Sequence, residues 1–161
     1  MKRLPDFRSP DFLQEHLLQT LAFYEGRARD PSGGMFQFFK DDGRVYDPHT
    51  RHLVSSARFV VTFANAAAAF PDHPRADLWR DTARHALDFV QNVHRDPASG
   101  GYAWLLHWQD GRKSVLDATN HAYGLAFVLL AHAQALRAGI GEAADGLHAT
   151  RALIERHFWD A

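Results

Sequence analysis

The sequence has no cysteine, no excess of one charge and no long apolar run. The absence of cysteine excludes disulfide bonds and thiolate chemistry, and it is typical of a reducing compartment. A formal net charge of −1 does not favour nucleic acid or an anionic membrane surface as a partner. No segment reaches the roughly 20 apolar residues of a transmembrane helix, and no signal-peptide pattern opens the chain. We therefore expect a cytoplasmic protein that binds neither nucleic acid nor a membrane.

Patterns that hold a cofactor are also missing. The pairs Gly33-Gly34 and Gly100-Gly101 each follow an expected helix and lead into an expected hairpin, so they predict chain reversals and not a phosphate-binding loop. The chain has eleven histidines, but pairs such as His49 and His52 lack a third ligand at zinc spacing. We expect no metal and no other cofactor. Four further histidines are expected on the solvated faces of helices: His85, His94, His148 and His157.

What the sequence does contain is an internal repeat. Residues 30–36 are echoed by residues 96–102, and Asp42-Gly43-Arg44 is echoed by Asp110-Gly111-Arg112, a period of 66 to 68 residues. Each copy predicts a helix, a Gly-Gly loop, a short hairpin turned by Asp-Gly and a second helix. The chain thus repeats one supersecondary unit.

Two kinds of helix alternate along these units. Helices expected at about 11–27, 75–94 and 143–158 have one apolar face, which is typical of an outer layer. Helices expected at about 51–70 and 121–136 are apolar around nearly their whole circumference, which predicts inner helices buried on all sides. The expected inward-facing residues of the outer helices include Leu13, Leu17 and Leu78. The pattern predicts an all-α, double-layered helical barrel with about five helices and small β-hairpins in its loops.

This pattern stops in the middle of a unit, after an outer helix. Because two inner helices cannot close a ring, we expect a truncated barrel that either pairs as a homodimer or is completed by a missing C-terminal part. A self-contained five-helix bundle is the alternative.

Three motifs carry a resemblance to a known family. Residues 51–59, 100–104 and 120–127 resemble, in the same order, motifs of the N-acylglucosamine 2-epimerase family, most of all its mannose isomerase and aldose–ketose isomerase branch. The resemblance implies an (α/α)₆ barrel, of which residues 1–161 are the N-terminal portion of a single domain without a separate boundary. It further implies a monosaccharide substrate and isomerisation, such as D-mannose to D-fructose, by proton transfer through an enediolate without a metal or nucleotide.

The same resemblance assigns the candidate site residues. Arg51 matches an arginine at the start of the first inner helix, and we interpret it as a catalytic residue that would bind a hydroxyl or enediolate oxygen. The candidate substrate-binding residues are Asn120, His121, Trp104 and Tyr102. Each has a structural alternative: ion pairing with a loop carboxylate for Arg51, helix capping for Asn120 and His121, and packing for the aromatic residues. The two acid–base histidines of the family have no matching position, so the chain is expected to carry only part of the active site.

Two other function classes stay open. Asp41, Asp42, Asp110 and Asp117 lie on loops near the expected barrel mouth, where paired carboxylates could serve a glycoside hydrolase. A non-catalytic helical-repeat module could instead bind a partner on its inner surface.

Overall fold

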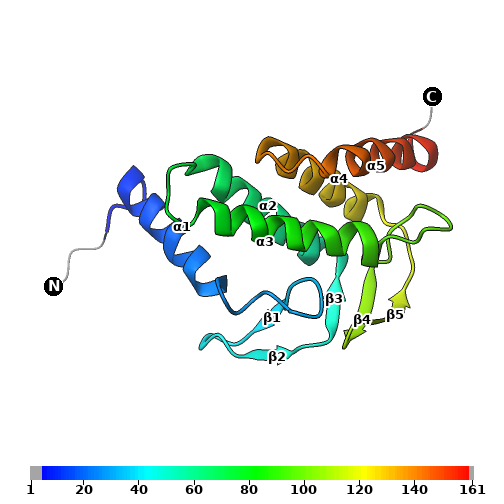
Figure 1. Cartoon of the computed structure of the whole chain (residues 1–161), viewed down its shortest axis with the longest axis horizontal. Coiled ribbons are helices and arrows are strands. Elements are labelled where there is room, and N and C mark those ends of the chain that lie inside the picture. Colours follow the sequence, from blue (N-terminus) through cyan, green and yellow to red (C-terminus); the bar gives the residue numbers. More distant parts are fainter. Residues whose placement is uncertain (1–4, 160–161) are drawn as a thin grey trace.

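The repeat is built from helices that form a layer beside a group of short strands (Figure 1). A computed structural model describes residues 5–159 of the 161-residue chain. In that range the α-helices are α1 (Pro10–Tyr24), α2 (Leu53–Ala69), α3 (Ala76–Phe89), α4 (Ala122–Arg137) and α5 (Ala143–Phe158). A π-helical segment, Val90–His94, extends α3. All five helices expected from the sequence are therefore present, with ends that differ by no more than a few residues.

Both hairpins that the sequence predicts are present, and an additional strand extends the second one. β1 (Phe38–Phe39) and β2 (Val45–Asp47) form the first hairpin, and β4 (Leu105–Gln109) and β5 (Arg112–Asp117) form the second. The additional strand, β3 (Thr50–His52), pairs with β4, which gives a three-stranded antiparallel sheet in the order β3-β4-β5. This sheet joins the first copy of the repeat to the second. It also corrects one expectation: residues 51 and 52 lie in a strand, and the helix begins only at Leu53.

Local sequence signals explain where several elements start and turn. Ser9 caps α1 by accepting a hydrogen bond from the backbone N–H of Phe12, and Pro10 occupies the first turn. Between β4 and β5, Asp110 and Gly111 both have positive φ, at 49° and 76°, as a tight two-residue hairpin requires. The Asp-Gly signal was thus a correct guide to the second hairpin.

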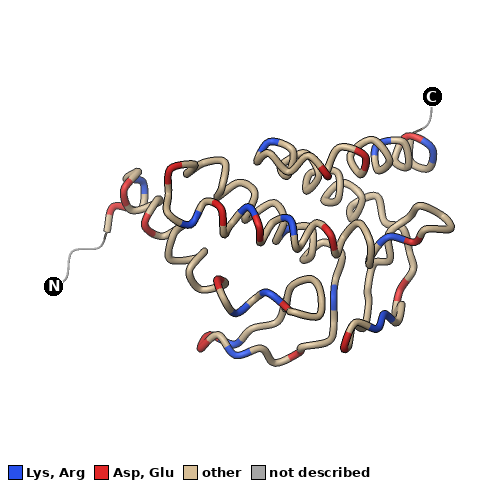
Figure 2. The backbone as a smooth tube through the Cα atoms, viewed as in Figure 1, with Lys and Arg blue, Asp and Glu red and all other residues tan. Residues whose placement is uncertain are grey.

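The main core lies where α2 packs against α3 and α4, with α5 covering α4. Large buried side chains such as Phe63, Trp79 and Leu125 fill it. Fully buried alanines such as Ala64 and Ala131 let the helix backbones approach closely. Figure 2 shows that acidic and basic residues alternate along the outer helix α3, which keeps one side of this layer in water.

Burial on all sides of the inner helices is not observed. Tyr123 and Leu130 on α4 are 62% and 39% exposed, and Arg58 on α2 is exposed. Three leucines expected to face inward are also open to solvent, Leu13 at 53%, Leu17 at 43% and Leu78 at 48%. On α1 and α4, some apolar side chains therefore remain exposed because no described helix packs against them.

Candidate functional site

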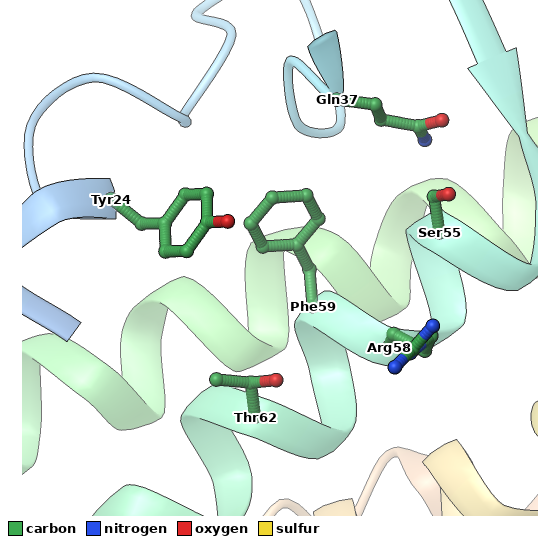
Figure 3. Close-up of a pocket in the computed structure, with 6 residues that line it drawn as sticks. All are labelled: Tyr24, Gln37, Ser55, Arg58, Phe59 and Thr62. Carbon is green, nitrogen blue, oxygen red and sulfur yellow. The ribbon is translucent and has the colours of Figure 1, made fainter. Parts of the chain in front are cut away.

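A hollow of about 340 Å³ opens on one face of α2 (Figure 3). It is lined by Tyr24, Gln37, Ser55, Arg58, Phe59 and Thr62. The four residues from α2 follow the i, i+3, i+4, i+7 spacing that brings side chains to one side of a helix. Tyr24 comes from the last turn of α1, and Gln37 from the loop just before β1. We call this hollow the α2 pocket.

Aromatic rings form one wall of the α2 pocket. The ring of Tyr24 lies edge-on to Phe59 at a centroid distance of 5.5 Å and to Phe39 at 5.7 Å. Figure 3 shows the Tyr24 and Phe59 rings beside one another, with the Gln37 amide across the pocket near Ser55. The pocket thus combines ring surfaces with hydroxyl and amide groups, a combination that suits a polyhydroxylated ligand.

Arg58 supplies the positive charge of the α2 pocket. Its guanidinium carbon lies 6.0 Å from the centroid of Phe127 on α4, at the outer limit of a cation–π contact. Among residues 5–159 no carboxylate forms an ion pair with Arg58, and its side chain is exposed. A guanidinium without a protein partner remains free to bind oxygen atoms of a ligand.

Gln37 is held rigidly against the start of α2. Its Oε1 accepts a hydrogen bond from the backbone N–H of His52 at 2.7 Å, while its Nε2 donates to Ser56 Oγ at 2.8 Å and to the His52 carbonyl oxygen at 3.3 Å. Two of these bonds run from the loop before β1 to the last residue of β3, and the third runs to the first turn of α2. They place the pocket wall made by Gln37 at a defined position relative to the helix.

Behind Gln37 lies a buried histidine. His94 is 0% exposed, its Nδ1 lies 2.9 Å from the Ala103 carbonyl oxygen, and its Nε2 lies 2.9 Å from Ser56 Oγ. The carbonyl can only accept, so Nδ1 carries the proton and Nε2 accepts from Ser56. Burial is the largest cause that lowers the pKa of His94 from 6.5 to about 4. The expectation of a solvated His94 is wrong, because the π-helical segment turns this ring inward onto α2.

Arg51 is enclosed by the loops beneath β3. Its guanidinium donates to Asp30 Oδ2 at 2.6 Å and to the carbonyl oxygens of Pro48 and Thr50, and it stacks on the Phe36 ring at 5.1 Å. The side chain is 0% exposed, and burial lowers its pKa while the Asp30 charge opposes that effect. In this structure Arg51 ties two loops together, and its catalytic assignment stays a prediction.

The four predicted substrate-binding residues fall into two groups. Tyr102 is 2% exposed and its hydroxyl lies 3.1 Å from Thr150 Oγ1, while Asn120 Oδ1 accepts from the Tyr102 backbone N–H. Burial raises the pKa of Tyr102. Trp104 and His121 lie edge-to-face at 4.4 Å, beside the last residue of β3. The structure thus brings Trp104 and His121 together at the starts of both inner helices, whereas Tyr102 contributes to the core.

The carboxylates considered for glycoside hydrolysis lie elsewhere. Asp41, Asp42 and Asp110 are exposed at the hairpin tips, and none of them lines the α2 pocket. Within the described range no three His, Cys, Asp or Glu side chains come close enough to hold a metal ion. The described helices also include none with the length and hydropathy needed to cross a membrane.

Sequence reasoning missed Arg58, Gln37 and Ser55. A signal for two of them was present, because Ser55 and Arg58 are polar residues at helical spacing in a helix that is otherwise apolar. Gln37 has no comparable local signal, since its partners lie 15 and 19 residues further along the chain.

Comparisons with known proteins agree with this architecture. The family model for N-acylglucosamine 2-epimerase (GlcNAc 2-epimerase) matches residues 34–161. A D-mannose isomerase from Marinomonas mediterranea is 48% identical over 156 residues, which are 97% of this chain and 37% of that protein. A crystal structure of D-mannose isomerase matches with a TM-score of 0.87 and 46% identity, over 98% of this chain and 38% of the other. A cellobiose 2-epimerase from Spirochaeta thermophila matches with a TM-score of 0.73 and 27% identity, over 94% and 38% of the two chains. The chain therefore spans well under half the length of these relatives.

Proposed function

Because the chain belongs to the N-acylglucosamine 2-epimerase family, we propose that the α2 pocket is one wall of a monosaccharide site for aldose–ketose isomerisation, with D-mannose to D-fructose as the reaction. The observation that carries the proposal is the exposed, unpaired guanidinium of Arg58 in a pocket that it shares with an aromatic wall and the Gln37 amide. Ring faces suit the C–H groups of a sugar, and the polar groups suit its hydroxyls.

The chemistry assigns a role to Arg58. Isomerisation removes the proton from C2 of the open-chain aldose and returns it to C1, while the hydroxyl proton of O2 passes to O1. Negative charge develops on the carbonyl oxygen O1 in between. A fixed guanidinium stabilises such an oxyanion more than it stabilises the neutral carbonyl, which lowers the barrier. Arg58 on α2 would supply this charge, while Arg51 would hold β3 and its loops in place from inside.

The acid and base come from outside the α2 pocket. Proton transfer at C2 needs a group with a pKa near neutrality, such as an imidazole, and no histidine lines this pocket. We assign the two histidines implied by the family resemblance to further parts of an (α/α)₆ barrel. The relatives' greater length supports this, since additional inner helices would also cover the open apolar face of α4 formed by Tyr123, Phe127 and Leu130.

A binding and turnover experiment tests the proposal. D-Mannose is titrated into the chain and followed by NMR chemical shifts, and formation of D-fructose is assayed in the same samples. We expect Arg58→Ala to weaken sugar binding by about 10- to 100-fold, the range for loss of a charged hydrogen bond. Arg137→Ala is the matched control, because Arg137 is exposed at the far end of α4 and, among the residues that the structure describes, hydrogen-bonds only Gln134. Unchanged binding in the Arg58→Ala protein would remove Arg58 from the site.

A further inference from the structure

His52 occupies the junction between β3 and α2 and caps the helix. Its Nδ1 accepts a hydrogen bond from the backbone N–H of Val54 at 3.3 Å. A neutral imidazole has one protonated and one unprotonated nitrogen, so a ring that accepts at Nδ1 carries its proton on Nε2. The positive end of the helix dipole at this position also disfavours a second proton on the ring. The helix cap therefore selects one tautomer of His52.

Both the backbone and the ring of His52 are held in place. The Gln37 side chain bonds the His52 N–H at 2.7 Å and its carbonyl oxygen at 3.3 Å. The ring lies against Trp104 with centroids 4.3 Å apart and planes at 70°. A donor that is fixed before a ligand arrives binds without the entropic cost of ordering a mobile side chain.

The protonated nitrogen of His52 has no protein partner. Within residues 5–159 no atom forms a hydrogen bond with Nε2, and this nitrogen is not among the buried unsatisfied atoms, so it retains access to solvent. Burial of the ring and, to a smaller extent, the charge of His121 lower the pKa of His52. At neutral pH the group is therefore an uncharged N–H donor one helical turn before Ser55, which lines the α2 pocket.

We propose that the Nε2–H of His52 donates a hydrogen bond to an oxygen atom of the bound sugar. The inference deepens the proposed function and rests on it. Because the only free nitrogen of His52 already bears a proton, the residue serves as a fixed neutral donor and not as the base that removes the C2 proton. The ligand class is a monosaccharide whose hydroxyl or carbonyl oxygen reaches the common edge of β3 and α2.

His121 also contacts Trp104, but unlike His52 it has no hydrogen bond within residues 5–159 that fixes its tautomer. It also precedes a helix, α4, but its side chain caps no backbone group, and it is exposed. Nothing in the described chain selects its tautomer. Of the two histidines beside Trp104, His52 alone is therefore held in the tautomer that donates a hydrogen bond from Nε2.

Two substitutions at position 52 separate capping from donation. Asparagine is a strong helix cap and can accept from Val54, but it is too short to replace the Nε2 donor. His52→Asn should therefore unfold at nearly the wild-type temperature and bind D-mannose about 3- to 10-fold more weakly, the range for one neutral hydrogen bond. His52→Ala loses the cap as well and should also unfold at a lower temperature. His148→Asn, an exposed position on α5, should change neither property.

Long-range proton–nitrogen NMR spectra of the wild-type chain give an independent measurement. They should show His52 as the Nε2–H tautomer at neutral pH. A proton on Nδ1, or His52→Asn that binds mannose as tightly as wild type while Arg58→Ala binds weakly, overturns the inference and leaves the proposed function intact. A wild-type chain that binds no monosaccharide at all overturns the proposed function and this inference together.

Discussion

Acid should destabilise the chain through His94. The ring is 0% exposed and both of its nitrogens are engaged, Nδ1 with the Ala103 carbonyl oxygen and Nε2 with Ser56 Oγ. A second proton would convert Nε2 from an acceptor into a donor facing Ser56, whose hydroxyl already accepts from Gln37. The folded state can accommodate the cation only by breaking this chain of hydrogen bonds or by letting water reach the ring.

The size of the effect follows from the pKa of His94. Burial is the largest cause that lowers this pKa from 6.5 to about 4, and the hydrogen bond to the Ala103 carbonyl oxygen opposes this effect. The positive charges of Lys113 and Arg51, and that of His52 once acid protonates it, act on the pKa in the same direction as burial. Between these values the unfolded chain binds more protons than the folded chain, so the free energy of unfolding decreases as the pH falls. A pKa lower by about 2.5 corresponds, at 1.36 kcal/mol for each pH unit, to a full effect of about 3.4 kcal/mol. The stabilisation is complete above pH 6.5, and about 3 kcal/mol of it should be lost by about pH 4.

Urea unfolding, followed by tryptophan fluorescence, measures this loss in the wild type and in His94→Gln. The glutamine variant should be less stable at about pH 7.5, because it packs and bonds less well, but it has no group that titrates at this position. Other ionisable residues, including the buried His132, are the same in both proteins and cancel in the comparison. On acidification to about pH 4 the wild type should lose about 3 kcal/mol more than His94→Gln. An equal loss in the two proteins would refute the reasoning.

Two further predictions concern the loops that carry the site. Asp30→Asn should lower the free energy of unfolding by about 3 to 5 kcal/mol in urea, because it leaves the buried Arg51 guanidinium without its counter-charge. Unfolding at the wild-type urea concentration would contradict a structural role for this pair. Gly34→Ala should lower the thermal unfolding temperature more than Gly100→Ala: both have positive φ, at 70° and 75°, but a Cβ at position 34 would lie 2.7 Å from the Phe89 ring and one at position 100 meets open space. Equal unfolding temperatures for the two variants would show that a Cβ at position 34 does not clash with Phe89.

The helices were predictable because their signals are local. Apolar residues at helical spacing located all five, and a proline after a serine marked the start of α1. β3 was not predictable in this way. Its three residues adjoin a long apolar helix, and the partner that makes them a strand, β4, follows more than fifty residues later. A short strand has no periodicity of its own, so tertiary pairing decides its structure.

The site was harder to predict than the fold, for the same physical reason. Arg51 and Arg58 lie in one helix-like run of sequence, and nothing local shows which of them is buried. The difference comes from Asp30, which lies 21 residues before Arg51 and pairs with it only in the folded chain. In the sequence, Asp30 is indistinguishable from an ordinary turn residue. The expectation that His94 is solvated was also wrong. A π-helical segment replaces the regular α-helical spacing at the end of α3, and this change is not visible in the local sequence.

The two faces of α2 are coupled through Gln37. Ser55 lines the α2 pocket, whereas its neighbour Ser56 is buried and bonds His94 from the second copy of the repeat. Gln37 contacts both sides, since its amide is a wall of the pocket and also donates to Ser56. Gln37 itself is fixed by hydrogen bonds within the first copy, to His52 and Ser56. The bond from Ser56 to His94 then ties this group to the second copy, so the pocket wall and the junction between copies share one chain of hydrogen bonds.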